Sequence, residues 1–153
     1  MIYNEKNADV TKQEGYVIAH CISIDCAMGA GVVVPICNKH TMLRTACHSY
    51  VYNNYVTPGD IYRYEDNKGV VYNMFTKQYC YQHAGDGMTN EQYLDYLKSA
   101  LMNIKQSMQT NNETKLAMPR IGCGLDRCDW NEVSEIIKNV FNDTDIEILI
   151  CIK

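Results

Sequence analysis

The sequence lacks several features that would place it in a large functional class. It has 14 lysines and arginines against 18 aspartates and glutamates, and the net charge of −4 argues against the basic surface that nonspecific nucleic-acid binding needs. No apolar run can cross a membrane, since the run at 32–37 is short and contains Pro35. The N-terminal residues have no long apolar core typical of a signal peptide. We therefore expect a cytoplasmic protein with no membrane partner and no stable nucleic-acid binding.

The chain also lacks the motifs of common cofactor sites. Its eight cysteines include no Cys-x-x-Cys pair, and the two Cys-x4-Cys pairs have no histidines at zinc spacing. Cys21 and Cys151 lie in apolar runs, where thiols behave as small hydrophobic side chains. No Gly-Lys-Ser/Thr follows the glycine-rich turns and the dinucleotide spacing is missing, which argues against an ATPase or a dehydrogenase. We predict reduced cysteines, no metal and no cofactor.

The order of elements predicts one α/β domain spanning residues 1–153. The chain has no internal repeat, low-complexity stretch or linker, and its length allows a sizeable core. Strand and helix patterns are intermixed along it, which favours a three-layer α/β domain around a central sheet. A domain of this kind is expected to be a monomer. The apolar patterns predict strands at 2–3, 16–22, 61–64, 70–76, 115–119 and 146–152, the last buried on both faces.

Helical patterns follow the strands at three places. The segment 31–50 is predicted to be partly helical, interrupted by Pro35. Two further helices are marked by predicted capping boxes, Thr89 with Gln92 and Asp129 with Glu132. The expected inner faces are formed by Leu94, Leu97, Leu101, Ile104 and Met108 in the first, and by Trp130, Val133, Ile137, Val140 and Phe141 in the second.

Two glycine-containing turns are the best candidates for a binding site. The turns at 28–31 (Met-Gly-Ala-Gly) and 119–127 (Pro-Arg-Ile-Gly-Cys-Gly-Leu-Asp-Arg) each follow a predicted strand and precede a helical segment. Ligands bind at this position in open α/β sheets, and glycine lets backbone N–H groups approach an anion. Two such turns from distant parts of one domain suggest a diphosphate held between them. The alternative for 28–31 is a helix entry that needs glycine for packing.

Lys77 and Asp126 are the candidate catalytic residues. Lys77 ends the strand at 70–76, where partial desolvation can make a lysine nucleophilic; the alternative is a solvated strand end. Asp126 is either a general acid/base or an anion that stabilises the next helix. His20, inside an apolar strand, is more typical of a hydrogen-bonded core histidine than of a ligand-binding residue. Asp9 is either a turn former or an acceptor for adenine.

Taken together, these segments resemble the macrodomain family, in the branch of the terminal ADP-ribose protein glycohydrolase. The resemblance rests on Ala19–Ser23, on Asp25-Cys26 with 28–31, on Thr76-Lys77, on 118–127 with Trp130, and on 144–146. It implies a three-layer α/β/α macrodomain with a central mixed sheet, which binds ADP-ribose in a cleft at one sheet edge. The stretches 38–68 and 78–114 match only in pattern.

The resemblance also implies roles for individual residues. Asp9 would accept the adenine amino group, Lys77 would attack the anomeric carbon of the distal ribose, and Asp126 would give acid/base assistance and release the lysine adduct. Backbone groups of the two turns would flank the diphosphate. The implied ligand-binding residues are Asp9, Val10, His20, Ser23, Met28, Gly29, Ala30, Gly31, Pro119, Ile121, Gly122, Cys123, Gly124 and Leu125.

The expected function is therefore an ADP-ribosyl hydrolase. Its partners would be ADP-ribose and ADP-ribosylated proteins or nucleic acids, with the bond an ester to glutamate or aspartate, or a link to a nucleobase. A carboxylate is a good leaving group, so such an enzyme chiefly has to position a nucleophile and stabilise charge. Two alternatives stay open: an ADP-ribose 1″-phosphate phosphatase, and a reader module that binds ADP-ribose without turnover.

Overall fold

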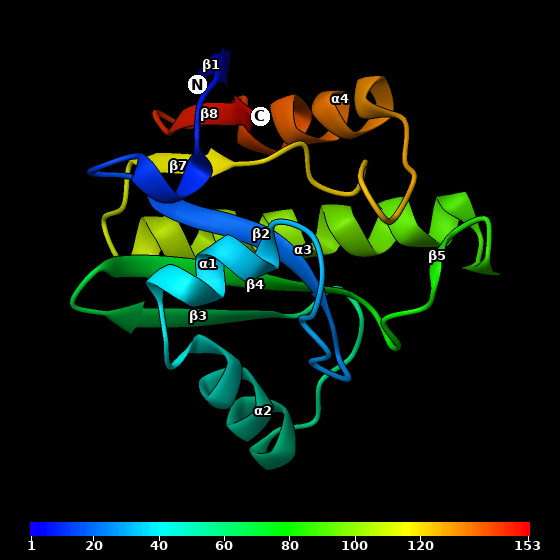
Figure 1. The fold of residues 1–153 in the computed structure, drawn as a ribbon. Coiled ribbons are helices and arrows are strands. Elements are labelled where there is room, and N and C mark those ends of the chain that lie inside the picture. The colour runs from blue at the N-terminus through cyan, green and yellow to red at the C-terminus, as the bar shows by residue number, and fades with distance from the viewer.

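A six-stranded mixed sheet lies between two layers of helices in the computed structural model, which describes all 153 residues (Figure 1). The strand order is β1-β8-β7-β2-β4-β3, with β3 alone antiparallel to its neighbour. This confirms the predicted three-layer α/β/α architecture. The strands are β1 (Ile2–Asn7), β2 (Val17–Ser23), β3 (Ile61–Asp66), β4 (Gly69–Lys77), β7 (Lys115–Met118) and β8 (Glu147–Ile152).

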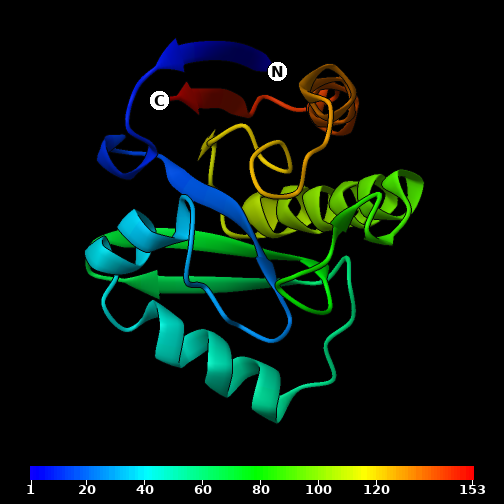
Figure 2. The ribbon, with the colours of Figure 1, turned by 45° about the vertical axis from the view of Figure 1, so that its right-hand side comes forward.

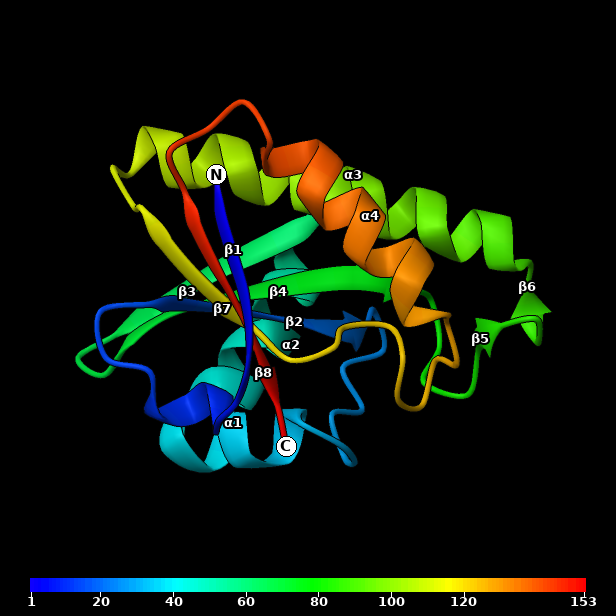
Figure 3. The same ribbon diagram turned by 90° about the horizontal axis from the view of Figure 1, so that it is seen from above.

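The helices cover both faces of this sheet. α1 (Val33–Lys39) and α2 (Leu43–Asn53) lie on one side, and α3 (Asn90–Thr110) and α4 (Trp130–Phe141) on the other (Figure 2). A short 3-10 helix, η1 (Val10–Lys12), follows β1. The two-residue strands β5 (His83–Ala84) and β6 (Gly87–Met88) pair with each other near the start of α3 (Figure 3). None of the helices is both long and apolar enough to cross a membrane.

The sheet separates two hydrophobic cores. Along β8, Ile148 and Ile150 pack with residues of α3 and α4, whereas Leu149 and Cys151 pack with residues of α1 and α2. This alternation is what the period of two in a strand imposes when both faces are covered. The prediction that 146–152 forms a strand buried on both faces is confirmed.

The predicted helical segment 31–50 consists of two helices, and Pro35 is not the break between them. Pro35 occupies the first turn of α1, where a backbone N–H has no helical partner and its loss costs little. The break lies at residues 40–42 instead. There His40 leaves the helix, and its Nδ1 lies 2.9 Å from Oδ2 of Asp66 at the end of β3.

One predicted capping box is confirmed and the other is wrong. Thr89 and Gln92 exchange both hydrogen bonds at the start of α3. At α4 the Asp129 carboxylate accepts from the backbone N–H of Asn131, 3.0 Å away, and Glu132 makes no return bond. The buried face of α3 also begins one residue earlier than predicted, at Tyr93, which is fully buried.

Candidate active site

A continuous cleft follows the edge of the sheet where the parallel strands end. It consists of three adjoining cavities of about 450, 380 and 310 Å³. We call them the Asp9 end, the middle and the Lys77 end. Val32 and Pro119 line both the Asp9 end and the middle, and Leu125 and Asp126 line both the middle and the Lys77 end. The cleft thus places the glycine turns between Asp9 and Lys77.

The first glycine turn is tied down by Asp25. Its carboxylate accepts from the backbone N–H of Ala27 at 3.2 Å, from the Ser23 hydroxyl, and from the backbone N–H of Cys80 at 2.9 Å. Burial alone would raise the pKa of Asp25, but these hydrogen bonds hold it below its usual value. Beyond this anchor the backbone turns sharply, with Met28 at φ 48° and Gly31 at φ 80°. The ionised carboxylate therefore fixes the turn that lines one wall of the cleft.

The second glycine turn uses its two glycines differently. Gly122 is buried at φ 74°, and a Cβ there would lie 3.2 Å from Cε1 of Tyr93. Gly124 is exposed, with no atom within 4 Å of the position a Cβ would take. Gly122 is thus required by the fold, while Gly124 leaves space open on the cleft. A Cβ at Gly31 would lie 3.6 Å from Cδ1 of Leu125, so the two turns come within contact distance of each other.

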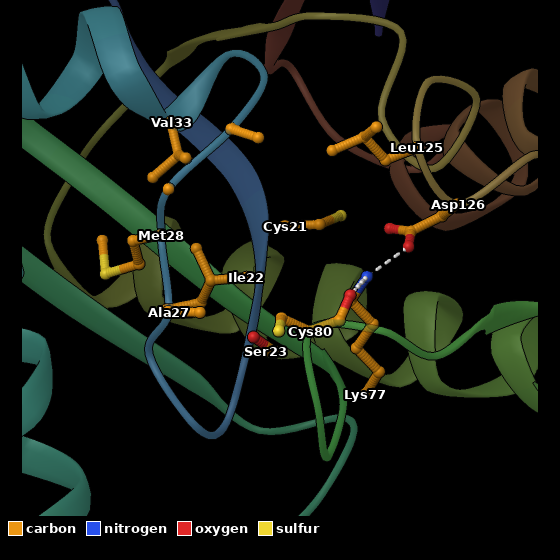
Figure 4. Close-up of a pocket in the computed structure, with 12 residues that line it drawn as sticks. Cys21, Ile22, Ser23, Ala27, Met28, Val33, Lys77, Cys80, Leu125 and Asp126 are labelled. Atoms are coloured by element: carbon orange, nitrogen blue, oxygen red, sulfur yellow. Dashed lines mark hydrogen bonds and ion pairs between the residues drawn. The ribbon is translucent and has the colours of Figure 1, made fainter.

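A buried ion pair occupies the Lys77 end (Figure 4). Nζ of Lys77 donates to Oδ1 of Asp126 at 2.6 Å, and also to the carbonyl oxygens of Gln82 at 2.8 Å and Cys80 at 3.1 Å. The two charged side chains are only 10% and 12% exposed. Three acceptors match the three protons of an ammonium group. The three contacts fix the position of Nζ, and Asp126 is the only carboxylate among them.

Tyr93 contacts the same ion pair, although the sequence patterns did not predict it as a site residue. Its hydroxyl donates to the other carboxylate oxygen of Asp126, Oδ2, at 2.6 Å. Burial and the nearby acidic groups, including Asp126, raise the pKa of Tyr93 well above its usual value, so the phenol stays protonated as a donor. One signal was available: Tyr93 stands four residues before Leu97 on the buried face of α3, and a buried phenol needs an acceptor. The acceptor lies 33 residues further along the chain and has no local signature.

The cysteines at the cleft are free thiols, as are all eight in the chain. Cys21 lines the middle and the Lys77 end, and burial together with the Asp126 charge raises the pKa of its thiol. It is therefore neutral and a poor nucleophile. Cys80 is exposed at the Lys77 end. No three His, Cys, Asp or Glu side chains gather closely enough to hold a metal ion.

The Asp9 end carries a carboxylate held by its own segment. Oδ1 of Asp9 accepts from the Thr11 hydroxyl at 2.7 Å and from the Thr11 backbone N–H at 2.9 Å. These hydrogen bonds lower the pKa of Asp9, so the group is an ionised acceptor. Oδ2 has a longer contact, 3.7 Å, to Nζ of Lys153. This oxygen is the one available to a ligand.

Most of the predicted site residues line the cleft, but two do not. His20 is fully buried, and its Nε2 lies 2.6 Å from Oδ1 of Asn73 in the neighbouring strand. Cys123 turns its thiol back to the carbonyl oxygen of Ile121. Neither side chain lines any of the three cavities. Those that do are Asp9, Val10, Ser23, Met28, Gly29, Ala30, Gly31, Lys77, Pro119, Ile121, Gly122, Gly124, Leu125 and Asp126.

Comparison with known proteins places this cleft in context. No protein-family model matches the chain. The human ADP-ribose glycohydrolase OARD1 is 33% identical over 133 residues, which cover 87% of this chain and 79% of the human protein, and the bovine protein of the same name matches equally.

Solved structures show the same fold at lower sequence identity. The macrodomain of Mycobacterium tuberculosis DarG superposes with a TM-score of 0.85 at 17% identity, over 98% of this chain and 97% of that one. Thermosipho africanus DarTG in complex with ADP-ribose gives a TM-score of 0.83 at 16% identity, over 99% of this chain and 42% of that one.

Proposed function

Because this chain belongs to the macrodomain family, in the branch of the ADP-ribose glycohydrolases, we propose that it is an ADP-ribosyl hydrolase. The observation that carries the proposal is the buried pair of Lys77 and Asp126 at one end of the cleft. A module that only binds ADP-ribose has no need of a desolvated lysine beside a carboxylate. Such a pair is a means of moving one proton and exposing one amine.

The proposed ligand lies along the whole cleft. Oδ2 of Asp9 accepts a hydrogen bond from the adenine amino group at one end. The diphosphate passes between the two glycine turns, where backbone N–H groups and the open space at Gly124 accommodate it. The distal ribose then reaches the Lys77 end. In this arrangement the Asp9 carboxylate selects adenine, and the anomeric carbon of the distal ribose lies next to Lys77.

The proposed reaction begins with the transfer of one proton from the Lys77 ammonium to the Asp126 carboxylate. The free amine attacks the anomeric carbon of the distal ribose, a C–N bond forms, and the bond to the leaving group breaks. The leaving group, a carboxylate or a nucleobase, departs with the electron pair. Water then adds to the same carbon and Lys77 leaves as the amine. The proton that this water loses passes to the departed nucleobase, or to solvent when the leaving group is a carboxylate. The proton on Asp126 returns to the Lys77 amine. The net products are ADP-ribose and the unmodified acceptor.

A panel of ADP-ribosylated compounds tests this proposal. The purified protein is offered ADP-ribose linked to glutamate, serine, thymidine and guanosine, and released ADP-ribose is quantified by chromatography. We expect release from the glutamate ester or from a nucleobase, and none from the serine ether, whose alkoxide is a poor leaving group. Tight binding of ADP-ribose with no release from any member would contradict the proposal and identify a reader module.

A further inference from the structure

We propose that Tyr93 is a positioning residue for this reaction, which fixes the Asp126 carboxylate so that one of its oxygens faces Lys77. The inference rests on the proposed function of the Lys77–Asp126 pair. The two oxygens of Asp126 have different partners at the same distance, 2.6 Å: Oδ1 meets the Lys77 ammonium and Oδ2 meets the Tyr93 hydroxyl. Tyr93 is fully buried and lines none of the three cavities, so it acts through Asp126.

Tyr93 is placed rigidly enough for this task. It lies in the first turn of α3, directly after the capping box of Thr89 and Gln92, and its backbone N–H donates to the carbonyl oxygen of Thr89 at 3.1 Å. Its side chain is fully buried, and a Cβ on Gly122 would lie 3.2 Å from Cε1 of its ring. The absence of a side chain at Gly122 thus leaves the space that the Tyr93 ring needs to reach Asp126. Through this hydroxyl, α3 is connected to the second glycine turn and to the ion pair.

The Tyr93 hydroxyl is also the neutral donor among the groups around Asp126. The other groups that face Asp126 are Lys77 from β4, the Cys21 thiol from β2 and the Cys128 thiol directly after the second turn. Burial raises the pKa of both thiols, that of Cys128 to about 12, so neither changes charge in the working pH range. Tyr93 is therefore the neutral group that orients the Asp126 carboxylate toward Lys77.

The test compares Tyr93→Phe with Tyr96→Phe in the full-length protein. Tyr96 lies three residues later on α3, is half-buried, and makes no side-chain hydrogen bond. Turnover of the substrate found in the panel is measured from pH 5 to 9, and ADP-ribose binding is measured by calorimetry. For Tyr93→Phe we expect kcat to fall about 10- to 100-fold, the range for a lost hydrogen bond to a charged group. KM and ADP-ribose affinity should stay within about 3-fold, so that the loss falls on kcat alone.

Three results would overturn the inference. They are an unchanged kcat in Tyr93→Phe, an equal loss in Tyr96→Phe, or a loss of kcat accompanied by an equal loss of ADP-ribose affinity, which indicates a merely structural role. Should Lys77→Ala retain full turnover, the proposed reaction itself fails. Should Lys77→Ala be inactive while Tyr93→Phe matches the wild type, only the role of Tyr93 fails. Calorimetric binding shows in each case that the variant is folded.

Discussion

The two ends of the cleft are constructed in opposite ways. At the Lys77 end, three side chains from β4, α3 and the second glycine turn meet in a buried network, with partners 33 and 49 residues apart in the chain. At the Asp9 end, a half-buried carboxylate is held by Thr11, two residues away, and its other oxygen is nearly free. Under the proposed function, the rigid end carries out the chemistry and the open end recognises the base.

The largest effect is expected at the Lys77 end. Lys77→Ala removes the nucleophile, so turnover should fall on the order of 10³-fold or more while ADP-ribose still binds. Lys77→Arg is the matched control, because it keeps the positive charge beside Asp126 but provides no nucleophilic amine. Both variants should be inactive in the substrate panel. Restored turnover in Lys77→Arg would mean that this end contributes charge alone.

The middle of the cleft should respond to a side chain at Gly124. No atom lies near the position of its Cβ, so Gly124→Glu should keep the wild-type melting temperature and weaken ADP-ribose binding on the order of 100-fold by calorimetry. Gly124→Gln separates the effect of side-chain bulk from that of charge and should weaken binding less.

Gly122→Ala should instead cost about 1–2 kcal/mol of folding stability, because an alanine is strained at this φ and approaches Tyr93. Equal melting temperatures for Gly122→Ala and the wild type would undo the distinction between the two glycines.

At the Asp9 end the expected effect is on binding alone. Asp9→Ala removes the acceptor for the adenine amino group and should raise the Kd for ADP-ribose about 10-fold, with kcat unchanged. Glu14→Ala, which removes an exposed carboxylate from the same segment, is the control for net charge. A change in kcat for Asp9→Ala would show that the two ends are not separate in function.

The effect with the least bearing on the cleft concerns stability, through His20 in β2. Burial lowers the pKa of this imidazole from 6.5 to about 4. Below pH 6.5 the unfolded chain binds a proton that the folded protein does not, so stability falls as the pH drops from 6.5 to about 4. The loss is about 2 kcal/mol by pH 5. Urea denaturation at pH 7 and pH 5 should show this loss for the wild type and a smaller one for His20→Gln; identical losses would place the titration elsewhere.

The comparison of the two ends also explains what the sequence could predict. Local patterns identified the six strands of the main sheet, the capping box at Thr89 and the two glycine turns. Lys77 and Asp126 were assigned their roles by family resemblance, because no spacing rule joins groups 49 residues apart. The predicted break at Pro35 was wrong because a helix tolerates proline in its first turn, and whether Pro35 lies there depends on where α1 begins.

Tertiary contacts decided what local patterns could not. Glu132 follows Asp129 at the right spacing, yet the carboxylate of Asp129 is satisfied by Asn131 alone. The apolar strand pattern predicts His20 as a core residue, whereas the family resemblance implies a ligand-binding role. His20 is fully buried, contacts Asn73 on the neighbouring strand and does not line the cleft. Tyr93 was not predicted because the apolar spacing of α3 fits equally well when the buried face begins at Leu94.

The most direct test of the central claim is to trap the adduct on Lys77. The protein is incubated with the substrate from the panel and sodium cyanoborohydride, which reduces the imine form of a lysine–ribose adduct to a stable amine. Intact mass spectrometry should then show the addition of one ADP-ribosyl group, and peptide mapping should place it on Lys77. Full turnover under these conditions with no adduct on Lys77, together with turnover by Lys77→Ala, would contradict the account.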